Sequence, residues 1–90
     1  MKPTRQEVAA AVIAAVAKVS GLQPEKIKEE YILKEHPLKL DDQQLNRLTL
    51  KLRKYIKSVD SAKTIWASTV QKSGQSVEGL IDYIFKLLNS

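Results

Sequence analysis

Apolar residues recur at helical spacing over the first twenty positions of the chain. The stretch TRQE from Thr4 to Glu7 forms a capping box, in which each side chain can bond the other residue's backbone amide. Gly21 follows the last apolar position and is typical of a helix C-cap. We therefore predict a helix between Thr4 and Gly21. Its inner positions are Val8, Val12, Ala15, Val16 and Val19, and its outer face is Ala10, Ala14 and Ala17.

A second and clearer amphipathic pattern covers residues 43–59. Asp41 or Asp42 can cap this helix, because short acidic side chains accept hydrogen bonds from the first free amides. The next segment, residues 61–73, predicts a short helix capped by Asp60 and stopped at Gly74. The positions predicted to face inward are Leu45, Leu48, Leu52, Tyr55 and Ile56 in the first of these helices, and Ala62, Ile65, Trp66, Thr69 and Val70 in the second.

The last periodic segment opens at Ser76 and covers residues 77–88, with Val77, Leu80, Ile81, Ile84 and Leu88 inward. Residues 22–40 contain two prolines and no sustained period, which predicts a long ordered loop anchored by Leu22, Ile27, Tyr31 and Leu33. No stretch alternates as a strand does. We therefore expect one all-α domain over residues 1–90, with three longer helices, one short helix and a long first connection.

Composition excludes several classes of chemistry. The chain has no cysteine, which rules out a disulfide, a thiolate nucleophile and a cysteine zinc site. His36 is its only histidine, so we expect it to be an exposed loop residue and we predict no metal site. No apolar run could span a bilayer, and charges interrupt the N-terminal segment where a signal peptide would be apolar. We expect a cytoplasmic monomer that is not an enzyme and holds no cofactor.

The net charge is +5 and the isoelectric point is about 9.6. A basic surface favours acidic partners, which include proteins, nucleic acids and anionic surfaces. The aromatic residues are scattered along the chain, and we assign them to the core instead of a base-stacking platform. They are Tyr31, Tyr55, Trp66, Tyr83 and Phe85.

Two stretches are similar to acyl carrier proteins. GLQPEKI, residues 21–27, resembles the turn that follows the first helix in that family, and SVEGLIDYI, residues 76–84, resembles its closing helix. Their order and spacing also agree, and the resemblance covers the chain from Glu7 to Leu88. It implies an acyl-carrier-like helical bundle. Family members carry acyl groups on a phosphopantetheine arm, which is attached to the serine of an Asp-Ser-Leu motif at the start of the second helix.

This chain has no serine at the corresponding place. Depending on the register, the family's serine position falls at Asp41, Asp42 or Gln44, and no serine occurs between Ser20 and Ser58. Ser61, in the stretch VDSA, is an alternative attachment site, but the chain after it has room for only one short helix and a turn before the closing helix. We therefore predict a member of this kind without a phosphopantetheine site.

The second helix also differs in charge. The resemblance implies an acidic second helix that docks basic enzymes, whereas this one is basic, with Arg47, Lys51, Arg53, Lys54 and Lys57. At about 100° per residue, Leu50 points outward among Arg47, Arg53, Lys54 and Lys57. We predict that this surface binds an acidic protein partner. Two alternatives stay open: binding of nucleic acid or an anionic surface through the same helix, and acyl carriage through Ser61.

Overall fold

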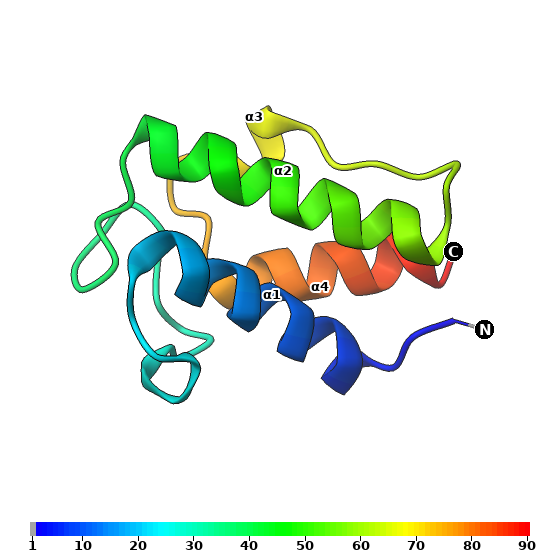
Figure 1. The fold of residues 1–90 in the computed structure, drawn as a ribbon, viewed down its shortest axis with the longest axis horizontal. Coiled ribbons are helices and arrows are strands. Elements are labelled where there is room, and N and C mark those ends of the chain that lie inside the picture. Colours follow the sequence, from blue (N-terminus) through cyan, green and yellow to red (C-terminus); the bar gives the residue numbers. More distant parts are fainter. Residues whose placement is uncertain (1) are drawn as a thin grey trace.

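Three long helices form the body of the molecule, in a computed structural model that describes residues 2–90 (Figure 1). They are α1 (Arg5–Ser20), α2 (Asp42–Val59) and α4 (Val77–Leu88), and α1 packs against both of the others. A single 3-10 turn, η1 (Pro24–Lys26), and a short helix, α3 (Ala67–Gln71), complete the element order. Within residues 2–90 there is no strand, only an isolated bridge between Ile32 and Ser76. The predicted all-α class and the order of three longer helices and one short helix are confirmed.

The ends of α1 lie where the sequence predicts them. The Thr4 hydroxyl accepts from the Glu7 amide at 3.1 Å, and the Glu7 carboxylate accepts from the Thr4 amide at 2.9 Å. Gly21 adopts a φ of 79°, which glycine tolerates best, and its amide closes the helix on Ala17. All five predicted inner positions are buried. Ala17 is buried too, contrary to its prediction as an outer residue, because η1 folds back against α1.

Asp41, and not Asp42, caps α2. Its carboxylate accepts from the Gln44 amide at 2.8 Å, and the Gln44 side-chain oxygen accepts from the Asp41 amide at 2.9 Å. The side-chain nitrogen Nε2 of Gln44 donates to the carbonyl of Val19 at 3.0 Å, which connects the start of α2 to the end of α1. The predicted inner leucines and Ile56 are fully buried, and Tyr55 is half-buried at the edge of the helix.

The long first connection is attached to the start of α4. The amides of Val77 and Glu78 donate to the carbonyls of Tyr31 and Glu29 at 2.9 and 2.8 Å, and Leu33 donates to Gln75 at 2.9 Å. The bonds from Val77 and Glu78 satisfy amides that the first turn of α4 leaves free. Ile27 and Leu33 are buried as predicted, and Leu38 and Leu40 of the same loop join them in the core. Figure 1 shows this loop at the opposite end of the bundle from both termini.

The predicted helix at residues 61–73 is wrong in its bounds. Residues 63–66 are not helical, and α3 holds only Ala67–Gln71. Asp60 accepts from the Ala62 amide in a turn and does not cap α3. The guanidinium of Arg53 donates both Nε and Nη2 to the carbonyl of Ile65, at 3.1 and 2.9 Å, so this carbonyl already has partners outside a helix. Ile65 and Val70 are buried as predicted, whereas Ala62 and Trp66 are exposed.

α4 forms as predicted. The Ser76 hydroxyl accepts from the Gly79 amide at 2.9 Å, and the five predicted inner residues are buried. Every helix among residues 2–90 is too short or too polar to cross a bilayer.

Candidate docking surface on α2

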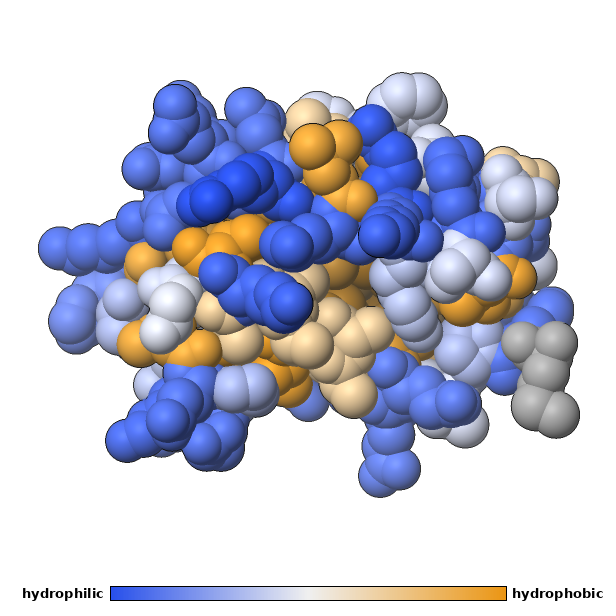
Figure 2. Space-filling model, in the orientation of Figure 1, coloured by the Kyte–Doolittle hydropathy of each residue, from blue (hydrophilic) through white to orange (hydrophobic). Residues whose placement is uncertain are grey.

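Leu50 lies on the outer side of α2 with 61% of its surface exposed. At about 100° per residue, Arg47, Lys54 and Lys57 project within about 60° of it, while the buried leucines of the helix point the opposite way. In the orientation of Figure 1, the space-filling view shows a small apolar patch among hydrophilic atoms over α2 (Figure 2). The outward leucine and its neighbouring cations, predicted from the helical pattern, are therefore found on one face.

The charge of the protein is concentrated on this helix. α2 holds five cations and one carboxylate, Asp42, whereas the rest of the chain holds ten cations and nine carboxylates. Arg47, Lys51 and Lys54 are exposed. None of them forms an ion pair within residues 2–90. They remain available to an acidic partner.

The other two cations of α2 have neighbours. Lys57 points its ammonium toward the carbonyl of Ser61 at 3.5 Å. Arg53 is half-buried, and its guanidinium serves the carbonyl of Ile65. Both were predicted as partner-binding residues. Arg53 also stabilises the fold through its hydrogen bonds to the carbonyl of Ile65.

Trp66 belongs to the same region, and the sequence interpretation assigned it to the core. Its side chain is 63% exposed, and the guanidinium carbon of Arg53 lies 5.9 Å from the centre of its ring, within cation–π range. In an extended segment successive side chains point to opposite faces, so the burial of Ile65 turns Trp66 outward. The signal available from the sequence was the pair Thr64–Ile65, because β-branched residues disfavour a helix. Tyr83 is also exposed, on α4.

The three residues at the predicted attachment position lie in the cap and first turn of α2. Asp41 is the cap, Asp42 the first residue and Gln44 the third, and none of the three carries a hydroxyl. Ser61 is exposed in the turn after α2. His36 is exposed in the first loop, and residues 2–90 contain no group of histidines and carboxylates that could hold a metal ion.

An open hollow of about 470 Å³ lies between the start of α1 and the end of α2. Lys2, Pro3, Glu7, Ala10, Tyr55 and Val59 line it. Partial burial raises the pKa of the Tyr55 hydroxyl, and the negative charge of Glu7 raises it further. Tyr55 lies about 140° around α2 from Leu50, so this hollow is separate from the candidate docking surface.

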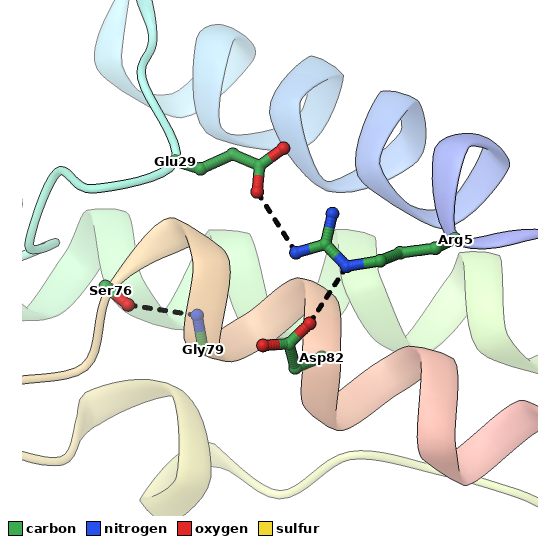
Figure 3. Close-up of polar contacts among 5 residues, drawn as sticks. All are labelled: Arg5, Glu29, Ser76, Gly79 and Asp82. Carbon is green, nitrogen blue, oxygen red and sulfur yellow. Dashed lines mark hydrogen bonds and ion pairs between the residues drawn. The ribbon is translucent and has the colours of Figure 1, made fainter.

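A second charged cluster joins three segments of the chain (Figure 3). Arg5, at the start of α1, donates from Nη2 to Glu29 of the first loop at 3.1 Å and from Nε to Asp82 of α4 at 3.0 Å. The hydrogen bonds to Glu29 and Asp82 raise the pKa of Arg5 above its ordinary value. Arg5 therefore joins α1, the first loop and α4, and its charge is already paired with two carboxylates.

Comparison of the chain with protein-family models, with curated proteins and with solved structures finds no match.

Proposed function

We propose that the protein is an acyl-carrier-like bundle without a phosphopantetheine site, and that the outer face of α2 docks an acidic protein partner. The observation that carries this proposal is Leu50, which is 61% exposed at the centre of the one helix that holds nearly all of the net charge.

The arrangement of helices supports the carrier-like part of the proposal. A long connection separates α1 from α2, and the short α3 precedes the closing helix α4, as the family resemblance implies. The start of α2 presents carboxylates and an amide where a carrier needs a serine hydroxyl. A transferase therefore has no nucleophile there to attach the arm.

The chemistry of the α2 face supports protein docking. Interfaces commonly have an apolar centre inside a polar rim, and a few central side chains supply most of the binding energy. The rim charges of such a surface steer partners of opposite sign and repel those of like sign. An exposed leucine among unpaired cations has this composition, and it selects for a partner rich in carboxylates.

Affinity capture from nuclease-treated extract of the source cells tests the proposal. We expect the wild-type protein to retain a defined acidic protein that Leu50→Glu fails to retain, with unchanged helical circular dichroism. Reversing Arg47 and Lys54 to Glu should have the same effect. Lys28→Glu is the matched control, because it reverses an exposed charge in the first loop, away from α2. Equal retention by wild type and both α2 variants would refute the proposal.

The exposed ring of Trp66 beside a basic helix favours nucleic-acid binding as a second candidate function. This candidate predicts binding to a single-stranded oligonucleotide that falls steeply as salt increases and that depends little on Leu50. Protein docking predicts the reverse dependence on Leu50. A salt titration with wild type and Leu50→Ala separates the two.

The exposure of Ser61 makes carriage through an atypical serine testable as well. Incubation with coenzyme A and a phosphopantetheinyl transferase would add one arm to the intact chain if Ser61 were a carrier site. We expect no change of mass, because the residue lies outside the start of α2.

A further inference from the structure

We infer that Trp66 and Leu50 are two anchors of one docking surface, and that its ligand is an acidic peptide segment with two apolar side chains, one for each anchor. This inference rests on the proposed function and deepens it, because it specifies the chemistry of the partner. The sequence interpretation placed Trp66 in the core, so this surface has one more anchor than the helical pattern predicted.

Arg53 connects the two anchors. It lies one helical turn after Leu50 on α2, where side chains three residues apart are neighbours. Its guanidinium carbon is 5.9 Å from the centre of the Trp66 ring. Leu50, Arg53 and Trp66 therefore form a short row in which a cation separates two exposed apolar side chains.

The position of Trp66 is fixed before any partner binds. Arg53 holds the preceding carbonyl, of Ile65, with two hydrogen bonds, and the carbonyl of Trp66 accepts from the amide of Thr69 at 3.0 Å. The Gln71 side chain of α3 donates to Asn46 of α2 at 2.6 Å. These contacts fasten both sides of the tryptophan to α2. A pre-ordered anchor loses little conformational entropy on binding.

The distribution of charge around α2 determines which charge the ligand should carry. Around α2, Arg53 and Trp66 lie to one side of Leu50, and Arg47, Lys54 and Lys51 lie to the other. The latter three have no carboxylate partner within residues 2–90. Carboxylates of a bound segment would therefore meet this cationic side while its apolar residues contact the two anchors.

The same observations favour a peptide over a nucleic acid. Binding of single strands generally uses several aromatic side chains on which successive bases stack. On this face, within residues 2–90, Trp66 is the one exposed aromatic residue, since Tyr83 lies on α4. Arg53 has already committed two N–H groups to the carbonyl of Ile65, so it has fewer donors left for a phosphate.

A displayed library of random peptides of about 16 residues tests the inference, since that length forms about four helical turns. Selection uses the wild-type protein, and peptides that also bind Leu50→Glu are discarded. We expect the selected peptides to be acidic and to share two apolar positions. A labelled synthetic copy should then bind wild type and shift the emission of Trp66, the only tryptophan of the chain, to shorter wavelengths.

Three variants locate the second anchor. We expect Trp66→Ala to weaken binding of the selected peptide at least about tenfold, and Trp66→Phe, which keeps an aromatic ring, to stay within about threefold of wild type. Tyr83→Ala is the matched control, because it removes an exposed aromatic ring from α4, and it should bind as wild type does. Circular dichroism confirms that each variant is folded.

The outcomes separate the inference from the function on which it rests. Selected peptides that bind Trp66→Ala as tightly as wild type, or that carry no excess of carboxylates, would overturn the inference and leave docking through Leu50 standing. If no peptide binds wild type in preference to Leu50→Glu, the proposed function fails and the inference fails with it. A single-stranded oligonucleotide that shifts Trp66 emission at lower concentration than any selected peptide would overturn both.

Discussion

At the junction of α1, the first loop and α4, Arg5 contacts two carboxylates, whereas Arg47, Lys51 and Lys54 on α2 form no ion pair within residues 2–90. The partners of Arg5 lie 24 and 77 positions away in the sequence, so its charge joins segments that the fold brings together. The cations of α2 instead have like charges beside them.

This difference separates charges that stabilise the fold from charges that do not. Arg47 and Lys51 are four residues apart on α2, as are Arg53 and Lys57, and like charges at this spacing destabilise a helix. The face therefore carries a small cost in stability, which an external acidic partner would relieve. Five predictions extend this comparison between the α2 face and the packed parts of the fold, from the largest expected effect to the smallest.

Leu48 and Leu50 lie two residues apart on α2, one fully buried and one exposed. We expect Leu48→Ala to lower the free energy of unfolding by about 3 kcal/mol, because it leaves a cavity in the core. Leu50→Ala should change the free energy of unfolding by less than about 0.5 kcal/mol, since most of this side chain is already exposed to water. Urea unfolding followed by circular dichroism measures both. Equal losses would show that the α2 face is part of the packing and is not free for a partner.

Arg53 is more like Arg5 than like the other cations of α2, because its guanidinium is hydrogen-bonded within the fold. Arg53→Ala should lower the free energy of unfolding by about 1 kcal/mol, since the Ile65 carbonyl loses two donors. The emission of Trp66 should also change, because the ring loses its cation. Lys54→Ala, one residue along the helix, is the control; it should not lower the free energy of unfolding and should leave the emission of Trp66 unchanged. If Arg53→Ala changed neither the free energy of unfolding nor the emission of Trp66, Arg53 would not be what holds Trp66 in place.

Arg5→Ala should loosen the junction locally. The Glu78 and Val77 amides donate to the loop backbone at Glu29 and Tyr31, beside the carboxylate that Arg5 holds. Without the arginine, we expect faster hydrogen exchange at these two amides and a modest fall in the midpoint of thermal unfolding. Arg47→Ala removes an unpaired cation and should leave the exchange of both amides unchanged. If the two amides exchanged at the same rate in Arg5→Ala and Arg47→Ala, the charges at the junction would be no more important to the fold than those on α2.

Local patterns predicted the helices well because caps and apolar spacing act within a few residues. The Thr4, Ser76 and Gly21 caps and most of the buried positions of α1, α2 and α4 were available from the sequence; Ala17 of α1 and Thr49 of α2 are buried positions that the pattern did not give. The outward position of Leu50 was available for the same reason, since it follows from the turn of a single helix.

The features that the sequence interpretation missed depend on contacts between distant segments. The short α3 reflects the bond from Arg53 to the carbonyl of Ile65, twelve positions along the chain. Trp66 is exposed next to the buried Ile65 in the same non-helical segment, and the helix predicted over residues 61–73 gave no sign of this exposure. The burial of Ala17 has the same kind of cause, because it depends on where η1 folds back.

Reversing one charge on α2 should slightly stabilise the protein. Lys51→Glu places a carboxylate four residues after Arg47 and three before Lys54, which turns repulsion into attraction. We expect a gain of about 0.5 kcal/mol in the free energy of unfolding at low salt, and a smaller gain at high salt because of screening. Lys28→Glu in the loop should give no comparable gain. A loss of stability in Lys51→Glu would contradict the view that the cations of α2 repel one another.

Tyr55, at the inner edge of α2, should give the smallest effect, and it is one of pH. Partial burial and then the charge of Glu7 raise its pKa above the ordinary value of about 10, so the folded protein holds the phenolic proton more tightly than the unfolded chain does. This contribution to stability is complete below pH 10 and is lost as the pH rises from 10 through the folded pKa. Urea unfolding on both sides of this range should show a steeper fall for wild type than for Tyr55→Phe, which has no proton to lose. The two proteins differ only in the Tyr55 hydroxyl, so the difference between the two curves isolates this group. Identical curves would show that the edge of α2 facing α1 is as open to water as the face around Leu50.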